Sequence, residues 1–361
     1  PLLAGPRVSP VKIALLASTF LPRIGGAELA VHNLAMQFKK LGHEVTVVTW
    51  WGQGRAVRNQ VSYPVRTMAP RSFTIGDKRF AEAYFELIHH PMEDDGVDFW
   101  WMDWQQGTET ALGGLDPLWW LNHLHFYDYA RNGQQRPFIF SRWGGLGNHR
   151  YPIGFSGDTV VGWDALDNQP SFTATAANVA YGWWSHDIGG HMGGIEEDEL
   201  YARWMQYGVF SPILRMHCTN NPYHERRPWG RGPDAERAAS AALRLRHALI
   251  PYIYSMAWRE HTTAMPLITP LYYTHPEQPE AYECGQEYWF GSQLLAAPFT
   301  RPAHPETGLS RQPVWFPAGE WFHFFSGEAL HGTQCGYHEK AHADGDGQWI
   351  ARQAEQVFAA G

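Results

Sequence analysis

The 361-residue chain has few cysteines, no excess of positive charge and no long apolar run, and each shortage excludes a class of protein. Its three cysteines, Cys218, Cys284 and Cys335, are far apart and match neither a metal-binding spacing nor an even-numbered disulfide framework, so we expect plain thiols. Lys and Arg total 28 against 36 Asp and Glu, and the net charge of -8 disfavours nonspecific binding to nucleic acid or to an anionic membrane. No segment is long and apolar enough to suggest a membrane span.

The first residues, PLLAGPRVSPVKIALLAST, lack the features of a secretory signal. They contain a short apolar run, but no charged start and no small-residue cleavage site. From this and from the expected plain thiols we predict a cytoplasmic protein.

Aromatic residues are abundant: 18 Trp, 16 Tyr and 19 Phe make up 15% of the chain. Flat apolar rings suit stacking on the C–H faces of sugars, although the same rings also fill ordinary cores because each buries a large area. The composition therefore favours a carbohydrate as the neutral partner without deciding for it.

Residues 12–49, within a first part that extends to residue 72, read as a strand, a loop, an amphipathic helix and a second strand. Ala30, Leu34, Phe38 and Leu41 recur at helical spacing, and Gly42 is a typical C-terminal stop. Gly25 and Gly26 lie where a strand passes into a helix, a place that can receive an anion. The run FLPRIGGAELAVHNLA resembles the N-terminal half-domain of glycosyltransferase family 4, which would imply transfer from a nucleotide sugar. The glutamate pair of that family's second domain is not recognisable after residue 72.

Residues 73–265 alternate between short apolar strands and helices. The predicted strands each end in a polar residue, and they span 96–103, 137–142, 182–187 and 211–217. The predicted helices span 80–90, 117–131, roughly 172–181 and 197–207, followed by a long helical stretch that Asp234 caps and Pro251 kinks or breaks. This alternation predicts an α/β fold with a parallel barrel of the (β/α)8 type, here incomplete.

Residues 266–361 read as an antiparallel β region. Short runs rich in Tyr, Phe and Trp are separated by Pro and Gly, as in EYWFGSQLLAAPFT and PVWFPAGEWFHFFSGE. After Leu330 the tail HGTQCGYHEKAHADGDGQWIARQ shows no recognisable strand of a β-sandwich. We therefore predict three parts, with boundaries at 72 and 265.

Carboxylates stand at the ends of the predicted barrel strands. Hydrolysis of a glycosidic bond with retention needs two carboxyl groups about 5 to 5.5 Å apart, one to attack and one to donate a proton. The candidates are Asp103, Asp158, Asp164 and Asp187. From the residues alone, Asp103 can also be a helix cap and Asp158 a simple turn residue, and both readings stay open.

Five ordered motifs in residues 73–327 resemble glycoside hydrolase family 31, which consists mostly of α-glucosidases and α-xylosidases. They are DGVDFWWMDWQQG, SRWGGLGNHRYPIGFSGDT, SHDIGGH, PILRMH and LRLRHALIPYIYSMA. The resemblance implies a retaining α-glycoside hydrolase that needs no cofactor and acts on an oligosaccharide or other α-glycoside. Glucose, xylose and a 2-acetamido sugar all stay open as the sugar, because His191 and the residues after Asp103 differ from those of many α-glucosidases.

The resemblance also implies a role for each matching residue. Asp103 would be the nucleophile and Asp158 the general acid/base, and Arg142 would hold the acid/base and a sugar hydroxyl. Asp187 and His217 would hydrogen-bond the sugar, and Trp101 and Trp184 would wall the site. For His217 a core histidine is the alternative. We expect no metal, because His186 and His191 do not have the spacing of two ligands on one helix.

Two other functions remain as alternatives. Family members carry a β-sandwich and three barrel strands before the nucleophile strand, and the sequence shows neither. The chain can therefore be an inactive, chimeric or truncated product that at most binds carbohydrate. Sugar transfer through the N-terminal segment is the second alternative.

Overall fold

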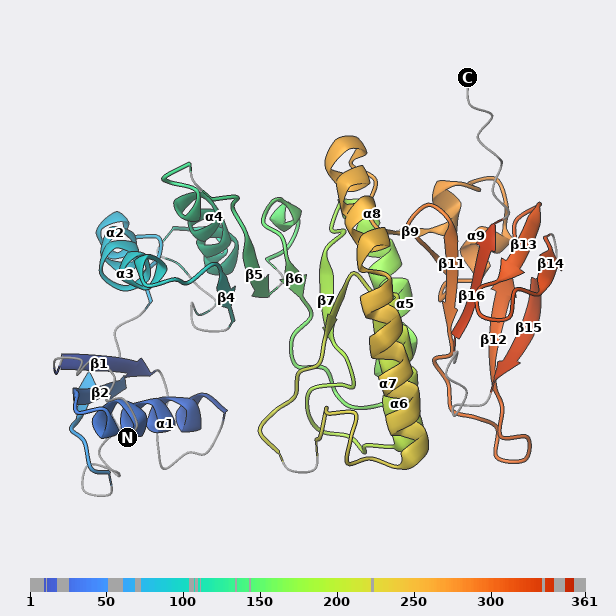
Figure 1. The fold of residues 1–361 in the computed structure, drawn as a ribbon. Coiled ribbons are helices and arrows are strands. Elements are labelled where there is room, and N and C mark those ends of the chain that lie inside the picture. The colour runs from blue at the N-terminus through green and yellow to red at the C-terminus, as the bar shows by residue number, and fades with distance from the viewer. Residues whose placement is uncertain are drawn as a thin grey trace, which may run out of the picture. The chain divides into compact units, whose positions relative to one another are not determined.

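The computed structural model describes residues 10, 12–17, 26–50, 61–68, 73–103, 107, 110, 112–133, 135–142, 144–221, 224–332, 335–340 and 348–353. The chain forms two compact units, one of residues 1–74 with 105–107 and one of residues 75–104 with 108–361. Figure 1 shows the path of the chain through its helices and strands. Within the described residues, no helix has the length and apolarity that a membrane span needs.

The first unit contains a small parallel sheet in the order β1-β2-β3. Its elements are β1 (Lys12–Ala17), α1 (Gly26–Lys40), β2 (Glu44–Trp50) and β3 (Val65–Met68). The strand-helix-strand prediction is confirmed, and β3 is a third strand that the sequence analysis missed. Ala35 of α1 packs against Val45, Val47 and Val65 in the core of this unit. Gly25, one of the two glycines suggested as an anion site, lies outside the described residues.

The second unit begins with the strands and helices of a barrel. A five-stranded parallel sheet has the order β4-β5-β6-β7-β8 within the described residues. The strands are β4 (Trp100–Met102), β5 (Ile139–Arg142), β6 (Gly154–Phe155), β7 (Trp184–Asp187) and β8 (Ile213–Arg215). A closed barrel of this type has eight strands, so the prediction of an incomplete barrel is confirmed.

Helices alternate with these strands. Before β8 they are α2 (Lys78–Tyr84), the π-helix η1 (Phe85–His89), α3 (His90–Asp94), α4 (Pro117–Tyr129), the 3-10 helices η3 (Asn148–Arg150) and η4 (Ala177–Val179), α5 (Trp163–Ala176) and α6 (Asp198–Val209). After β8 come α7 (Pro233–Ala248) and α8 (Ile250–Thr263). Helices α5, α6 and α7 share one apolar core, with Leu166, Trp204 and Ala239 among its buried residues.

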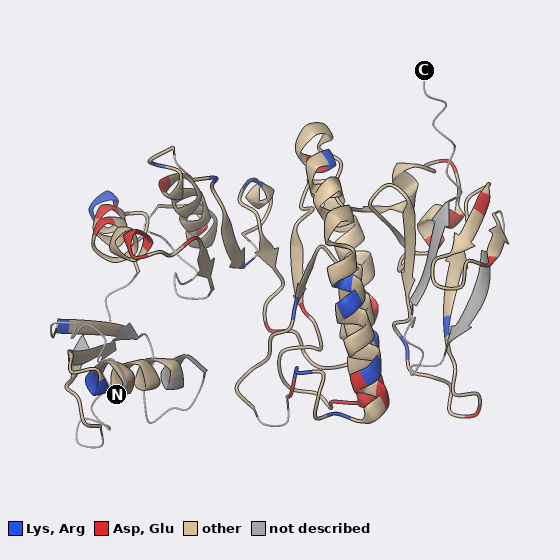
Figure 2. Ribbon diagram, viewed as in Figure 1, with Lys and Arg blue, Asp and Glu red and all other residues tan. Residues whose placement is uncertain are grey.

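Three local predictions need correction. Helix α5 spans Trp163–Ala176 and so begins about nine residues before the predicted start near residue 172; Pro170 lies in its interior without ending it. Gly232, not Asp234, is the N-cap of α7; Asp234 lies in the first turn, where its negative charge suits the helix dipole. Figure 2 shows acidic residues in red at that end of the helix. Strand β6 was read as part of a glycine-rich loop. The break at Pro251 is confirmed, because α7 ends at Ala248 and α8 begins at Ile250.

The antiparallel β region is also confirmed. Its main sheet has the order β14-β13-β16-β11-β10-β9, and β12 pairs with β15. The strands are β9 (Ile268–Pro270), β10 (Tyr288–Phe290), β11 (Leu294–Pro298), β12 (Ser310–Trp315), β13 (Glu320–His323), β14 (Ala329–His331), β15 (Cys335–Lys340) and β16 (Gln348–Gln353), with η5 (Leu271–Tyr273) and α9 (Glu280–Glu283) between β9 and β10. The tail after Leu330 therefore supplies strands after all, and β16 lies between β13 and β11.

Candidate active site

Aromatic and charged side chains from neighbouring strands meet on one face of the parallel sheet. The guanidinium of Arg215 on β8 lies 5.4 Å from the ring centre of Trp101 on β4, 5.3 Å from that of Phe140 on β5 and 5.2 Å from that of Phe155 on β6. Because alternate residues of a strand share a face, Asp103 and Arg142 are delivered to the same side as Trp101 and Phe140. The carboxyl ends of the strands thus carry a polar cluster above an aromatic layer.

Arg142 joins two of the candidate carboxylates. Its Nε donates a hydrogen bond to Oδ1 of Asp103, and its Nη2 donates to Oδ1 of Asp158 at 2.8 Å. The Arg142 side chain is only 4% exposed, whereas those of Asp103 and Asp158 are 20% and 36% exposed. A buried guanidinium that binds two partly exposed carboxylates fixes their positions and leaves both open to a ligand.

Gly157 makes this approach of Arg142 possible. It has φ +81°, a conformation that side-chain-bearing residues rarely adopt, and a Cβ built on it would collide with the Arg142 guanidinium. The glycine before Asp158 is therefore required both by the turn and by the arginine packed against it.

Asp187 at the end of β7 belongs to a second part of the cluster. Its Oδ1 accepts a hydrogen bond from Nη1 of Arg215 at 2.7 Å, and its side chain is 1% exposed. Its Oδ2 lies 3.2 Å from Nδ1 of His191, whose Nε2 lies 3.8 Å from Oδ1 of Asp158. The His191 ring thus lies between the Asp187 and Asp158 carboxylates, and its centre is 4.8 Å from that of the His217 ring.

Burial shapes the electrostatics of this part. Burial lowers the pKa of Arg215, against the opposing charges of Asp187 and Asp103. Burial and the charge of Arg215 together lower the pKa of His217. His217 is therefore neutral near pH 7, when it can offer one hydrogen-bond donor and one acceptor to a sugar hydroxyl.

Six of the seven predicted site residues meet in this cluster: Trp101, Asp103, Arg142, Asp158, Asp187 and His217. The centre of the Trp101 ring is 5.9 Å from that of His217, and 47% of Trp101 is exposed. An exposed indole beside two carboxylates offers an apolar surface on which a sugar ring can stack.

Trp184 is the exception and corrects the prediction that it walls the site. Its ring packs against Phe172 of α5, with centres 5.1 Å apart, and against Tyr181 at 5.0 Å. Trp184 is three residues from Asp187 on β7, so the two side chains point to opposite faces of the strand. Its indole belongs to the packing between sheet and helix.

Two further candidates also lie outside the cluster. Asp164 is exposed in the first turn of α5. His186 is buried on the helix-facing side of β7, where burial lowers its pKa to about 3 and Thr173 Oγ1 lies 2.8 Å from its Nε2. Within the part of the chain that the structure describes, no three His, Cys, Asp or Glu side chains are arranged to hold a metal ion.

Sequence reasoning missed the roles of Arg215 and His191 in this arrangement. Arg215 was visible as the charged residue at the end of a predicted strand, two residues before His217 on the same face. His191 was noted only as a departure from many α-glucosidases and as a poor metal ligand. Its place between Asp187 and Asp158 depends on the conformation of the turn at Gly189 and Gly190, which the local sequence does not specify.

Comparison with family models identifies the chain. Residues 38–256 match the TIM-barrel domain of glycosyl hydrolase family 31, and residues 264–352 match the C-terminal domain of the same family. The chain belongs to glycoside hydrolase family 31. The barrel match begins inside α1, and the proposed resemblance of residues 12–72 to glycosyltransferase family 4 stays a prediction, as do the domain boundaries at 72 and 265.

Curated relatives and solved structures agree with this membership. The chain is 31% identical over 207 residues to α-glucosidase 2 of Bacillus thermoamyloliquefaciens, covering 57% of this chain and 25% of the relative. It is 29% identical over 269 residues to an α-xylosidase of Saccharolobus solfataricus, covering 66% of this chain and 35% of the relative. A family 31 dextranase of Flavobacterium johnsoniae, solved with glucose, has the same fold, with a TM-score of 0.68, 21% identity and coverage of 89% of this chain and 44% of that one. The chain thus spans about a quarter to a third of the length of these two curated relatives.

Proposed function

We propose that this family 31 chain carries the catalytic centre of a retaining α-glycoside hydrolase, with Asp103 as nucleophile and Asp158 as general acid/base. In this mechanism Asp103 attacks the anomeric carbon while Asp158 protonates the leaving oxygen. Asp158 then takes a proton from the water that releases the sugar from Asp103. The products are a free sugar of unchanged anomeric configuration and the leaving alcohol.

One observation carries the proposal: Asp103 and Asp158 accept hydrogen bonds from adjacent nitrogens, Nε and Nη2, of a single guanidinium. Two carboxylates bound to one such group lie within a few ångströms of each other. Retaining enzymes separate their carboxyls by about 5 to 5.5 Å, whereas inverting enzymes need about 6.5 to 9.5 Å to admit a water molecule. The shared arginine therefore favours retention.

The surrounding residues supply the means to bind a sugar. His217 offers hydrogen-bonding groups beside the two carboxylates, and Trp101 offers an exposed ring face. The Asp187 side chain is 1% exposed and binds Arg215, so it supports the site rather than facing a sugar. We propose an α-linked glucoside or xyloside as substrate, because the curated relatives of the chain include an α-glucosidase and an α-xylosidase. Recognition by these residues requires no cofactor.

The test is hydrolysis of aryl α-glucoside and aryl α-xyloside by the full chain and by Asp103→Asn and Asp158→Asn. Asp103→Asn should abolish turnover. Asp158→Asn should still let aryl substrates whose leaving group needs no protonation react with Asp103, which gives a burst of released phenol. Its steady-state turnover should be slow, because the water that releases the sugar then lacks its base. Asp164→Asn is the matched control, because Asp164 is an exposed aspartate outside the cluster.

Proton NMR of the first-formed sugar completes the test. Release of the α-anomer supports double displacement through Asp103. Release of the β-anomer, or unchanged turnover by Asp103→Asn, would contradict the proposal. A folded chain that turns over neither substrate would instead support the inactive carbohydrate-binding alternative.

A further inference from the structure

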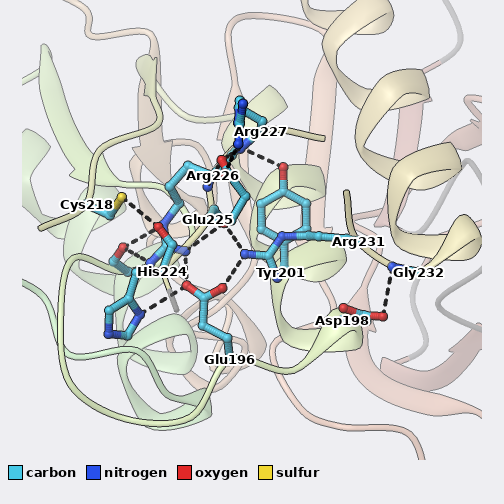
Figure 3. A network of polar contacts seen from close by, with 11 residues as sticks. Glu196, Asp198, Tyr201, Cys218, His224, Glu225, Arg226, Arg227, Arg231 and Gly232 are labelled. Atoms are coloured by element: carbon cyan, nitrogen blue, oxygen red, sulfur yellow. Dashed lines mark hydrogen bonds and ion pairs between the residues drawn. The ribbon is translucent and has the colours of Figure 1, made fainter. Parts of the chain in front are cut away.

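A buried ionic network lies in the loops that follow β7 and β8 (Figure 3). The carboxylate of Glu196 accepts hydrogen bonds from Nη1 of Arg226 and Nη2 of Arg231, and its Oε1 lies 3.2 Å from Nδ1 of His224. The side chains of His224, Arg226 and Arg231 are 6% to 7% exposed and that of Glu196 is 13% exposed. Charges this deeply buried are stable only when paired, so the four side chains depend on one another.

Glu196 is ionised at neutral pH. Burial would raise its pKa, but the hydrogen bonds and charges of Arg226 and Arg231 outweigh burial and hold the pKa of Glu196 below its usual range. Arg231 also lies over the Tyr201 ring, 3.9 Å from its centre, and the Tyr201 hydroxyl donates to the backbone oxygen of Arg226 at 3.0 Å. The network therefore holds Arg226 at both its side chain and its backbone.

Arg226 uses its remaining N–H groups to hold the turn after β7. Its Nε and Nη2 both donate to the backbone oxygen of Gly190, the former at 2.9 Å. The Gly190 N–H in turn donates to the backbone oxygen of Asp187 at 2.8 Å, which closes the turn. Arg226 is thus hydrogen-bonded to Gly190, the last residue of the turn that connects Asp187 to His191.

The turn has no spare room. A Cβ at Gly189 would lie 2.8 Å from Cδ of Arg226, and one at Gly190 would lie 2.8 Å from Cγ2 of Val161. Gly189 and Gly190 have φ +95° and +80°. Because the turn is packed between Arg226 and Val161, a shift of Arg226 must shift the turn.

His191 follows the turn directly and receives its position from it. Its backbone N–H donates to the Thr159 oxygen at 2.7 Å, and its backbone oxygen accepts from the Thr219 N–H at 2.9 Å. The loops after β6, β7 and β8 therefore meet at this residue. Its ring lies between Asp187 and Asp158, as described above.

We propose that Arg226, held by Glu196, is a positioning residue that sets the His191 ring between Asp187 and Asp158. The inference rests on the proposed function, because Asp158 is the acid/base only if the chain is a hydrolase. It extends that function to a network that does not itself contact Asp103 or Asp158. A displaced His191 ring should slow the chemical step, because catalysis is sensitive to displacements of about 1 Å.

The test compares Arg226→Lys with Arg227→Lys in the full chain. Lysine at 226 keeps the positive charge but lacks the planar guanidinium that donates to Glu196 and to the Gly190 oxygen at the same time. Arg227 pairs with Glu225 and has a side chain that is 63% exposed, so the same substitution there is the matched control. The readout is the His191 imidazole NMR signals, identified by their loss in His191→Gln. They should shift in Arg226→Lys and stay in place in Arg227→Lys.

A kinetic comparison then separates positioning from stability. In an active chain, Arg226→Lys should lower kcat about tenfold to a hundredfold with a smaller change in KM, and should move the pH profile. In the His191→Gln background the same substitution should add little, because both changes act through one ring. If Arg226→Lys fails to fold, His224→Gln takes its place. It alters the contact between residue 224 and the Glu196 carboxylate and keeps both Arg226 and Arg231.

The outcomes are distinct. An inactive chain would refute the proposed hydrolase, yet the NMR signals would still decide the positioning role. A variant with lowered Tm but unchanged His191 signals would overturn the proposal and leave the network as a structural support. Equal shifts in Arg226→Lys and Arg227→Lys would overturn it as well.

Discussion

Replacing Gly157 by alanine tests the arrangement around Arg142 with a single methyl group. Gly157 has φ +81°, and its added Cβ would collide with the guanidinium that holds Asp103 and Asp158. The substitution removes none of the proposed catalytic groups. It acts only by pushing Arg142 away from two carboxylates, so its effect measures how far the site depends on that contact.

The magnitude follows from two separable costs. An alanine in the left-handed region costs about 1 to 2 kcal/mol, partly offset by about 0.4 to 1 kcal/mol because alanine stiffens the unfolded chain. Forcing a methyl group into a packed site costs about 1 to 3 kcal/mol more. Gly157→Ala should therefore lower the free energy of unfolding by about 2 to 4 kcal/mol and lower kcat/KM about a hundredfold or more.

Gly327→Ala is the control for the backbone cost. Gly327 has φ +72° between β13 and β14, and a Cβ built there meets nothing within 4 Å. It should lose about 1 kcal/mol in a denaturant titration and keep full activity on an aryl α-glycoside. Equal kcat/KM for the two variants, compared at a temperature where both are folded, would refute the reasoning that Arg142 is fixed through Gly157.

Two further predictions concern the tryptophans Trp101 and Trp184 and the partly buried carboxyl of Glu260. Trp101→Ala should raise KM about tenfold and lower the free energy of unfolding by only about 1 to 2 kcal/mol, because about half of the ring is exposed. Trp184→Ala should lower the free energy of unfolding by about 3 to 5 kcal/mol; kinetics and denaturant unfolding distinguish the two variants, and the opposite assignment would contradict the geometry. Burial raises the pKa of Glu260 on α8 to about 7, from 4.5. Because the folded state favours the protonated carboxyl of Glu260, the contribution of this group to folding stability is complete below pH 4.5 and is lost as the pH rises through 7. Glu260→Gln should therefore remove on the order of 1 to 2 kcal/mol of pH dependence between pH 5 and 8, after allowance for partial exposure, and a Tm profile unchanged by the substitution would refute this.

The barrel could be predicted because most of its strands are short apolar runs that end in a polar residue. Strand β6, Gly154–Phe155, escaped prediction because two residues carry no periodicity and glycines surround them. The start of α5 was misplaced because its first half, with Asp164, Asp167 and Pro170, carries no clear helical pattern of apolar residues. Strand β16 was missed because a strand in a polar tail is stabilised by its neighbours β11 and β13 rather than by its own sequence.

The site could be predicted where one motif supplied both the residue and its strand. Asp103, Arg142 and Asp187 each stand at the carboxyl end of a predicted strand, so their convergence follows from the parallel sheet. His191 and Arg226 could not be predicted in this way. Their places depend on the turn at Gly189 and Gly190 and on hydrogen bonds between residues 30 or more positions apart.

The error over Trp184 shows what the alternation of a strand can still decide before a structure is known. Side chains an even number of residues apart on one strand share a face, and those an odd number apart do not. Trp101 and Asp103 satisfy this condition, and the structure places both at the cluster. Trp184 and Asp187 are three residues apart. Once Asp187 is assigned to the site, Trp184 must therefore point to the other face of the strand, toward α5, where its ring packs against Phe172. The same parity excludes His186 and leaves Arg215, two residues before His217, as the cation on the site face of β8.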